Sequence, residues 1–372
     1  MNAVLADDVR RALARVIDPE IRRPITELDM IGAVDVADGV ARIDLKLTVV
    51  GCPAADTIER DVLEAASSVT GVSSVAINVG VMTKLERDTL TDKLRGGRSR
   101  DMQFGPDSLT RIYAITSGKG GVGKSTVTAN LGVALAARGL RVGIVDADVF
   151  GFSIPGLMGI TGAKPTQVSE MILPPVAFDV KVISIGMFVD GSTAVSWRGP
   201  MLHRTITQFL TDVFFGDLDV LLLDLPPGTG DIAISIGQLL PHAEVIVVTT
   251  PQAAAADVAE RSAIVARQTG QKVIGVIENM AGFVQPDGSI LDIFGSGGGA
   301  DAAARLSTDT EPVPVLASIP LSIALREGGD AGLPVVLAHP EDPAAIAITA
   351  VAAQLATRSR GLAGRKLGLR VS

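Results

Sequence analysis

Residues 118–126 combine glycines with two lysines and a serine at a spacing suited to binding phosphate. They read GKGGVGKST and satisfy the pattern G-x-x-x-x-G-K-[ST], between an apolar run typical of a strand and a segment of helical periodicity. Glycines let backbone N–H groups converge on phosphate oxygens, and the N-terminus of the following helix adds partial positive charge. We expect Lys124 to neutralise the β- and γ-phosphates of a nucleotide and Ser125 to bind its Mg²⁺. The predicted nucleotide-binding residues of this loop are Gly118, Lys119, Gly120, Gly121, Val122, Gly123, Lys124, Ser125 and Thr126.

Aspartates follow two further apolar runs. Asp146 and Asp148 end the run VGIVDAD, and Asp224 ends the very apolar run VLLLD. An aspartate after a strand is often only a turn former. Three such acids, placed after the loop in the order that a nucleotide site requires, favour a role in that site. We expect the Asp224 carboxylate to approach Mg²⁺ through a water molecule.

Short β-branched runs alternate with helical stretches over residues 111–357, which predicts an α/β fold with a mostly parallel central sheet. The runs are apolar throughout, as is typical of parallel strands that helices cover on both faces. Ligands of such sheets bind beyond the carboxyl ends of the strands, and both the glycine-rich loop and the three acids follow strands. The apolar segment 344–356 is too short to span a membrane, so we expect a buried C-terminal helix there.

The pattern of residues 1–86 predicts a separate small α/β domain. An amphipathic helix precedes two strand-like segments that Asp38–Gly39 separates, and this dipeptide is a strong hairpin signal. A second helix and a third strand follow. Residues 87–110 mix charges with glycine and proline and are interpreted as a linker. Residues 358–372 contain basic side chains and no acid, and we interpret them as a frayed basic tail.

The composition excludes several classes of protein. The 372 residues include 33 basic and 41 acidic side chains, a formal net charge of −8, which argues against a globally basic nucleic-acid binder. Only 3% of the residues are aromatic, so a base-stacking platform is not expected. One cysteine excludes a disulfide framework and a four-cysteine cluster site within one chain. Because no secretory signal and no apolar run of about 18 residues occurs, we expect a cytoplasmic protein without a membrane span.

The early lysine of the loop, Lys119, makes GKGGVGKST resemble the deviant Walker A motif of the MinD, ParA, ArsA and nitrogenase-iron-protein class of P-loop ATPases. The resemblance implies a homodimer around two ATP molecules, in which Lys119 reaches the partner's nucleotide. It also implies that Asp148 orients the attacking water and that Asn279, at the end of KVIGVIEN, recognises adenine. Lys119, Lys124 and Asp148 are then the expected catalytic residues. A solvated loop lysine remains the alternative for Lys119.

Further segments resemble the Mrp/ApbC iron–sulfur carrier ATPases over residues 112 to about 336. These segments are DLPPGTGD, WRGPMLHRTITQFL, ENM, IFGSGGG and SIPLSIALREGGDAGLPVV, in the order of that family. Residues 1–86 resemble the iron–sulfur assembly domain fused in front of such ATPases, through DPE, TVVGCP and GVSSVAINV. The resemblance implies a carrier that binds and hydrolyses ATP and transfers iron–sulfur clusters to target apoproteins. By the same resemblance, Trp197–Arg198 belong to a loop near the dimer face.

One departure from that family concerns the cluster ligands. The usual C-x-x-C pair is absent, because residues 282–289 read GFVQPDGS, which predicts a tight turn in a hairpin. A dimer therefore offers two cysteines, both Cys52, and a four-thiolate cluster would need outside ligands. Cys52 is either a buried small hydrophobe or, before Pro53 at an expected helix N-terminus, a thiol of lowered pKa able to bind a cluster.

Two alternatives to the carrier stay open at this point. A positioning or partition ATPase of the MinD or ParA type would need a membrane-binding or DNA-binding surface, for which the basic tail is the candidate. An adaptor that nucleotide merely switches would need no cluster of its own.

Overall fold

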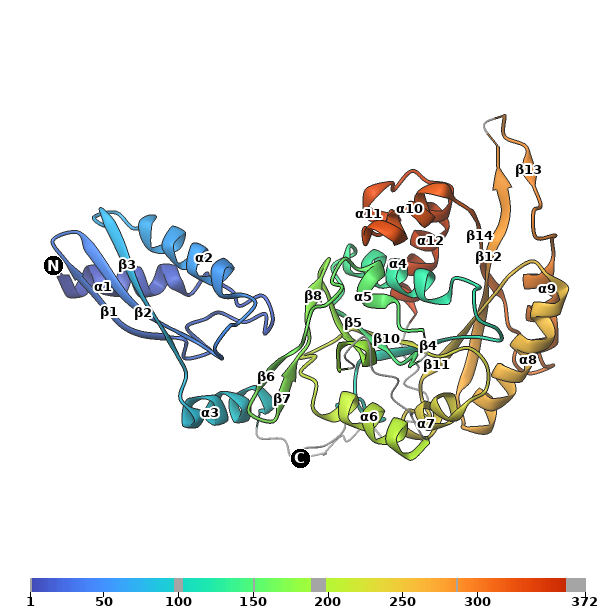
Figure 1. The fold of residues 1–372 in the computed structure, drawn as a ribbon, viewed down its shortest axis with the longest axis horizontal. Helices are drawn as coiled ribbons and strands as arrows, with labels where there is room; N and C mark the ends of the chain where they lie inside the picture. The colour runs from blue at the N-terminus through green and yellow to red at the C-terminus, as the bar shows by residue number, and fades with distance from the viewer. Residues whose placement is uncertain (1, 97–102, 150, 189–198, 286, 359–372) are drawn as a thin grey trace, which may run out of the picture.

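The structure is a computed structural model that describes residues 2–96, 103–149, 151–188, 199–285 and 287–358, and it contains two α/β units (Figure 1). The N-terminal unit has a three-stranded sheet in the order β1-β2-β3, with β1 antiparallel to β2 and β2 parallel to β3. Its elements are α1 (Asn2–Leu13), β1 (Ile31–Ala37), β2 (Val40–Leu47), α2 (Ala55–Ser67), β3 (Ser74–Val81) and α3 (Lys84–Arg95).

The core of this unit follows from the two periodicities of its sequence. In β2, Ala41, Ile43 and Leu45 alternate with more exposed residues and are buried. In α2 the buried residues Ile58 and Val62 lie one helical turn apart, so one face of the helix contributes to the same hydrophobic cluster.

The hairpin predicted at Asp38–Gly39 is confirmed. Ala37 pairs with Val40, and both turn residues have positive φ angles, 52° and 77°, as a two-residue hairpin turn requires.

Helix α3 was not expected, because its residues 87–95 fall in the segment interpreted as a linker. A capping box explains where the helix begins. The Thr83 hydroxyl accepts from the backbone N–H of Glu86, whose carboxylate accepts from the backbone N–H of Thr83. The helix ends at Gly96, which has a left-handed φ of 63°.

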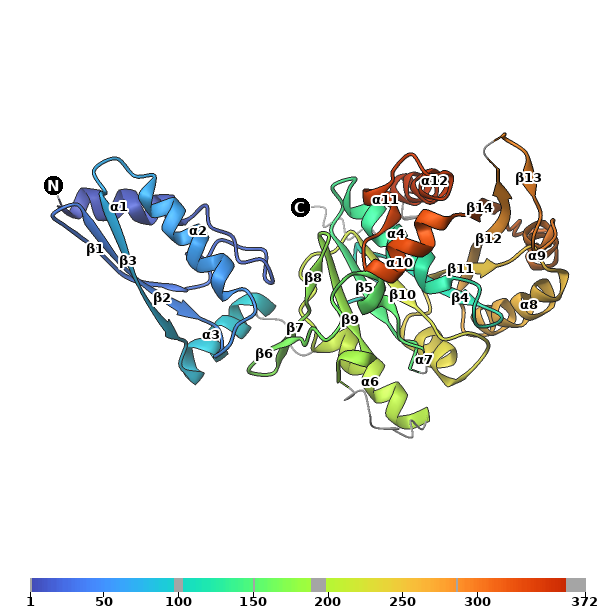
Figure 2. The ribbon, with the colours of Figure 1, turned by 45° about the horizontal axis from the view of Figure 1, so that its top comes forward.

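The second unit is the predicted α/β fold with a mostly parallel sheet, seen from a second direction in Figure 2. Its strand order is β13-β12-β11-β4-β10-β5-β9-β8, with β14 also paired to β12. The antiparallel pairs of this sheet are β12 with β13 and β8 with β9. The strands are β4 (Arg111–Ser117), β5 (Val142–Asp146), β8 (Val176–Ala177), β9 (Val180–Ser184), β10 (Val220–Asp224), β11 (Glu244–Thr249), β12 (Lys272–Val284), β13 (Ile290–Leu291) and β14 (Val315–Leu321).

Helices connect and cover these strands. They are α4 (Lys124–Ala136), α5 (Ile154–Leu157), α6 (Gly199–Thr211), α7 (Asp231–Leu239), α8 (Ala253–Gln268), α9 (Gly298–Leu306), α10 (Ile323–Ala331), α11 (Val335–Ala338) and α12 (Pro343–Thr357), with a 3₁₀ turn at Ile185–Phe188.

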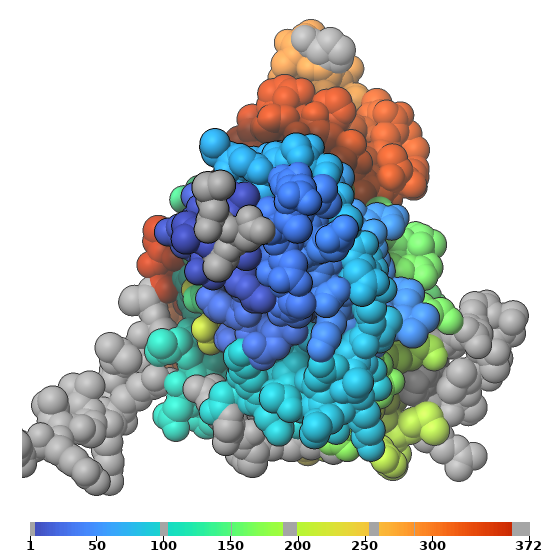
Figure 3. Space-filling model, turned by 90° about the vertical axis from the view of Figure 1, so that its left-hand side faces the viewer, coloured from blue at the N-terminus to red at the C-terminus, as the bar shows by residue number. Residues whose placement is uncertain are grey.

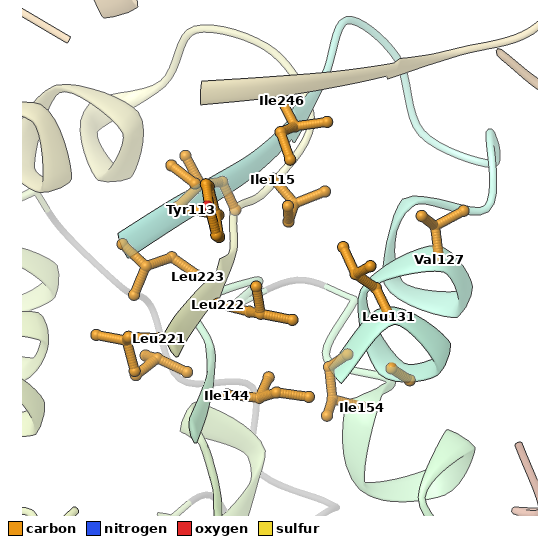
Figure 4. Close-up of a cluster of buried hydrophobic side chains, with 14 of the residues drawn as sticks. Tyr113, Ile115, Val127, Leu131, Ile144, Ile154, Leu221, Leu222, Leu223 and Ile246 are labelled. Atoms are coloured by element: carbon orange, nitrogen blue, oxygen red, sulfur yellow. The ribbon is translucent and has the colours of Figure 1, made fainter. Parts of the chain in front are cut away.

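The central strands are buried on both faces, as the continuous apolar runs predicted. Leu221, Leu222 and Leu223 of β10 have no exposed surface, and Figure 4 shows them among side chains from β4, β5, α4 and β11. Helix α12 confirms the expected buried C-terminal helix, with Ile348 and Val351 in the core. None of the helices in the described ranges is long and apolar enough to cross a membrane.

One small element of the second unit has side chains in the hydrophobic clusters of both units, since Ile172 packs in the second unit's core and Met171 in that of the N-terminal unit. The hairpin of β6 (Thr166–Val168) and β7 (Met171–Leu173) lies beside α3, toward the N-terminal unit (Figures 1 and 2). Figure 3 looks at the molecule from this side, where the blue residues of the N-terminal unit cover the centre of the face.

Candidate nucleotide-binding site

The glycine-rich loop joins the end of β4 to the start of α4, so a buried strand and a buried helix hold its two ends. Gly121 and Gly123 both have φ angles of +78°, a conformation that side chains rarely adopt. A Cβ atom on Gly123 would also lie 2.2 Å from Asn279 Nδ2. The loop therefore needs glycine at this position for its backbone conformation and for its close contact with β12.

Asp224 gathers three donors at the end of β10. Its carboxylate accepts from Lys124 Nζ at 2.7 Å and Ser125 Oγ at 2.6 Å through Oδ2, and from Thr128 Oγ1 at 2.8 Å through Oδ1. The side chain has no exposed surface. These contacts bring together Lys124, Ser125 and Asp224, the three residues predicted to bind phosphate and Mg²⁺. Thr128 was missed, although it lies one helical turn after Lys124 on α4.

The parallel register explains why the acids meet. Asp224 pairs with Ile115 of β4 on one side and with Asp146 of β5 on the other, so β10 and β5 end side by side, two residues before β4 ends. Asp148 follows two residues after Asp146, and its Oδ2 lies 3.9 Å from Lys124 Nζ. The Asp148 Oδ1 atom accepts from the backbone N–H of Gly151 at 3.1 Å. Asp148 is thus placed beside the lysine that is expected to bind phosphate.

Asp146 is buried behind this group. Its Oδ2 atom accepts from Ser184 Oγ of β9 at 2.9 Å and from the backbone N–H of Ile154. Burial, and then the charge of Asp224, raise the pKa of Asp146 to about 7. Its contacts indicate that it positions β9 and α5.

A cavity of about 590 Å³ opens above the loop, within the range of sites that bind small molecules. Residues 119–126, Asp148 and Asp231 contribute to its lining. Sequence reasoning did not find its apolar wall, which Leu202 of α6 and Ile232 of α7 help to form. The remaining lining residues are Ser117, Gly151, Ser153, Pro226, Pro227 and Gly230.

The Lys119 side chain forms a hydrogen bond within its own chain. Its Nζ donates to Gln252 Oε1 at 2.6 Å, just before α8. Lys119 also contributes to the lining of the cavity.

Asn279 lies under the loop. Its side chain is buried, and its Nδ2 donates to the carbonyl oxygen of Val122 at 2.9 Å. It is absent from the residues that line the cavity. The structure therefore gives Asn279 a contact that supports the loop, and recognition of adenine stays a prediction.

The oxygen atoms at the loop suit Mg²⁺. Mg²⁺ commonly binds one or two protein oxygens together with substrate phosphates, and Ser125 Oγ and Asp224 Oδ2 are 2.6 Å apart beside the cavity. Among the described residues, no group of three His, Cys, Asp or Glu side chains is arranged to hold a metal by itself. The residues present fit an ion that arrives with the nucleotide.

Cys52 lies outside this site, in the core cluster of the N-terminal unit. The side chain is 5% exposed, and its Sγ lies 3.9 Å from Glu20 Oε2. The expected lowering of its pKa is wrong, because burial raises the pKa of the Cys52 thiol. Moreover, α2 begins at Ala55 rather than at Pro53, so the thiol precedes the first helical turn.

The hairpin expected at residues 282–289 is present for its described residues. Phe283 and Val284 pair with Leu291 and Ile290, and the backbone N–H of Gln285 donates to the carbonyl oxygen of Ser289. Pro286 lies outside the described residues, as do Trp197–Arg198 and 359–372 of the basic tail.

Two family models match the chain. The model described as "NUBPL iron-transfer P-loop NTPase" matches residues 108–356, and the model described as "Iron-sulfur cluster assembly protein" matches residues 6–79.

Curated relatives match nearly the whole chain. The iron-sulfur cluster carrier protein of Mycobacterium tuberculosis is 54% identical over 365 residues, covering 97% of this chain and 96% of that protein. The protein of the same name from Bacillus subtilis is 37% identical and covers 85% of this chain and 88% of its own length.

Two solved structures share the fold of the second unit. The nucleotide-binding protein of Archaeoglobus fulgidus in complex with ADP is 37% identical, with a TM-score of 0.52, covering 60% of this chain and 86% of that one. The cell division ATPase MinD of Pyrococcus furiosus is 26% identical, with a TM-score of 0.50, covering 66% of this chain and 98% of that one.

Proposed function

Because the chain belongs to the family of NUBPL iron-transfer P-loop NTPases, whose curated relatives are iron–sulfur cluster carrier proteins, we propose that it hydrolyses ATP while carrying clusters to target apoproteins. The observation that supports hydrolysis is the convergence of Lys124, Ser125 and Thr128 on Asp224 beside the cavity. The nucleotide is the proposed substrate and the cluster the proposed cargo.

Each residue of the site then has a chemical role. The loop amides and Lys124 Nζ bind the phosphates, and Lys124 exchanges its contact with Asp224 for the β- and γ-phosphate oxygens. Ser125 and Asp224 hold Mg²⁺, which when bound neutralises charge on the phosphates. The Asp148 carboxylate accepts a hydrogen bond from the attacking water and aligns its oxygen with the γ-phosphorus atom.

We further propose a homodimer in which Lys119 leaves Gln252 and contacts the nucleotide of the partner subunit. A positive charge near the γ-phosphate stabilises the transition state in the way that arginine fingers do. The long flexible side chain, which is half-buried and contributes to the lining of the cavity, allows this movement.

The cluster itself does not fit a conventional site within this chain. Cys52 is the only cysteine, so a dimer supplies two thiols, and both belong to the buried core of the N-terminal unit. This observation favours a second candidate function, in which nucleotide switches the protein between partners and the cluster stays on another protein.

Phosphate release from ATP tests the enzyme assignment. We expect Lys124→Ala and Asp148→Ala to lose nearly all activity, while Lys84→Ala, a surface lysine of α3, keeps it. If wild type and Lys124→Ala release phosphate at the same rate, the chain is not an ATPase.

Mixing two inactive variants tests the role of Lys119. In a dimer of Lys119→Ala with Asp148→Ala, action in trans leaves one complete site, whereas action in cis leaves none. We therefore expect an equimolar mixture to recover about a quarter of wild-type activity, since half of the dimers are mixed. No recovery would exclude action across the dimer.

Anaerobic reconstitution separates the carrier from the adaptor. Iron and sulfide counts and absorption spectra of wild type and Cys52→Ser would show whether a cluster binds and whether the thiol holds it. A bound cluster that moves to an apoprotein supports the carrier, and ATP hydrolysis without any bound cluster supports the adaptor.

A further inference from the structure

The two units share a hydrophobic core through the β6–β7 hairpin. Val168, Met171 and Leu173 of the hairpin are buried, and they pack in the core cluster of residues 1–96. Phe214, which follows α6, packs in the same cluster. These four side chains belong to the ATPase sequence but are covered by the other unit.

Polar contacts accompany this packing. Thr166 Oγ1 of β6 donates to Glu20 Oε1 at 2.9 Å, and Ser169 Oγ donates to Asp88 Oδ1 of α3 at 2.6 Å. Cys52 lies under the same carboxyl group, because its Sγ is 3.9 Å from Glu20 Oε2. Contact with the hairpin therefore orients the group that neighbours the only cysteine.

Ionisable groups from both units are buried at the junction. Asp18 and Glu20 come from the N-terminal unit, and Lys181 comes from β9, where it is 3% exposed. Lys181 Nζ donates to the carbonyl oxygen of Phe214 and lies 4.7 Å from the centre of that ring. Buried charge opposes docking while the apolar contacts favour it, so the net free energy that holds the two units together is smaller than the apolar contribution alone.

The same segments reach the nucleotide cavity. Ile172 of the hairpin exchanges backbone hydrogen bonds with the residues after α6, donating to Asp212 at 2.9 Å and accepting from Phe214 at 2.8 Å. Leu202, in the first turn of α6, lines the cavity. Strand β9 gives a second link, since Ser184 Oγ donates to Asp146, two residues before Asp148.

We propose that nucleotide in the cavity weakens the docking of residues 1–96 by displacing α6 and, through it, the β6–β7 hairpin. The helix is continuous from Gly199 to Thr211, so movement at Leu202 reaches Thr211 as a rigid-body shift, and Phe214, whose backbone bonds to Ile172, follows three residues later. The N-terminal unit opens away from the hairpin, and Cys52 becomes accessible to solvent. This coupling rests on the proposed binding of nucleotide and adds to it a control of the N-terminal unit.

The single cysteine makes the coupling measurable in the unmodified full chain. We expect the reaction of Cys52 with dithiobis-nitrobenzoate to be slow without nucleotide and several-fold faster with Mg²⁺ and a non-hydrolysable ATP analogue, because the rate follows the population of the open form. Binding of a fluorescent ATP analogue is measured in the same samples. Lys124→Ala is expected to abolish the acceleration.

Two further variants separate docking from general loosening. Met171→Ala removes an apolar contact of the hairpin, so we expect faster labelling without nucleotide and a smaller effect of nucleotide. Val36→Ala, in β1 of the N-terminal core, is the matched control and is expected to keep the full nucleotide effect. Nucleotide that binds without changing the labelling rate would overturn the coupling alone, whereas failure to bind would overturn the proposed ATPase function as well.

Discussion

Thr128 Oγ1 donates a hydrogen bond to Asp224 Oδ1 across 2.8 Å, from the second turn of α4 to the end of β10. The other carboxylate oxygen, Oδ2, accepts from Lys124 and Ser125. In the proposed reaction Lys124 turns to the phosphates and Ser125 to Mg²⁺, and Thr128 would remain to hold the orientation of Asp224. Thr128 is therefore a positioning residue, since it acts on the reaction through Asp224.

Thr128→Val is expected to lower kcat for ATP hydrolysis about ten- to a hundredfold and to leave KM for ATP nearly unchanged. A hydrogen bond to a charged group is worth roughly 1.5–3 kcal/mol, and about 1.4 kcal/mol is a factor of ten in rate. Thr128→Ser keeps the hydroxyl and is expected to restore the rate. Phosphate release at varied ATP and Mg²⁺ concentrations checks this, and a wild-type kcat for the valine variant would contradict it.

Asn279→Ala is expected to weaken the binding of ATP and GTP to a similar extent, roughly tenfold, because Asn279 Nδ2 supports the loop at Val122. If Asn279 instead recognises adenine, as the sequence predicted, the substitution would weaken the binding of ATP alone. Titration with fluorescent analogues of both nucleotides distinguishes the two roles. A loss confined to ATP would favour the adenine role.

The sequence allowed much of the second unit, the P-loop NTPase unit, to be predicted because its signals are local. The loop 118–126 has a spacing that phosphate geometry dictates, and the family expected from it is confirmed. The continuous apolar strands reflect burial on both faces, whatever their order in the sheet. Asp224 could be placed because parallel register puts strand ends together.

The features that could not be predicted depend on contacts between residues that lie far apart in the sequence. Nothing in the short strands of β6 and β7 indicates that Met171 packs in the core of the other unit. Lys181, in the otherwise apolar run VKVIS, is buried against acids more than a hundred residues away. For Cys52, the local argument from a helix N-terminus failed because burial outweighs it.

Glu278→Ala is expected to lower the free energy of unfolding by about 3 kcal/mol. The Glu278 carboxylate accepts from the backbone N–H of Gly299 at 2.7 Å and from Ser318 Oγ at 2.9 Å, and removing it leaves the buried Gly299 N–H without this acceptor and ends a charged hydrogen bond. Glu278→Gln keeps one acceptor oxygen, so we expect a smaller decrease in the free energy of unfolding. Urea unfolding followed by circular dichroism measures the change, with Glu64→Ala on the exposed face of α2 as the control. An alanine variant as stable as that control would contradict the expectation.

Lys181 is expected to make the stability of the protein rise with pH above neutrality. Burial, and then the charge of Arg22, lower the pKa of Lys181 from 10.5 to about 7. Between these values the unfolded chain holds a proton that the folded chain has released, so folding becomes more favourable as pH increases, by at most about 1.4 kcal/mol per unit. Below about pH 7 both states are protonated, and Lys181 adds no slope.

Lys181→Met should remove this contribution, because it keeps an apolar side chain of similar length in β9 without a titratable group. We expect the difference in unfolding free energy, wild type minus variant, to increase between about pH 7 and about pH 9. Urea titrations of both proteins at several pH values measure it. Asp18 and Glu20, whose pKa values burial raises, are present in both proteins. A difference that stays constant over this range would show that Lys181 keeps its proton when buried, and that the acids facing it compensate its charge.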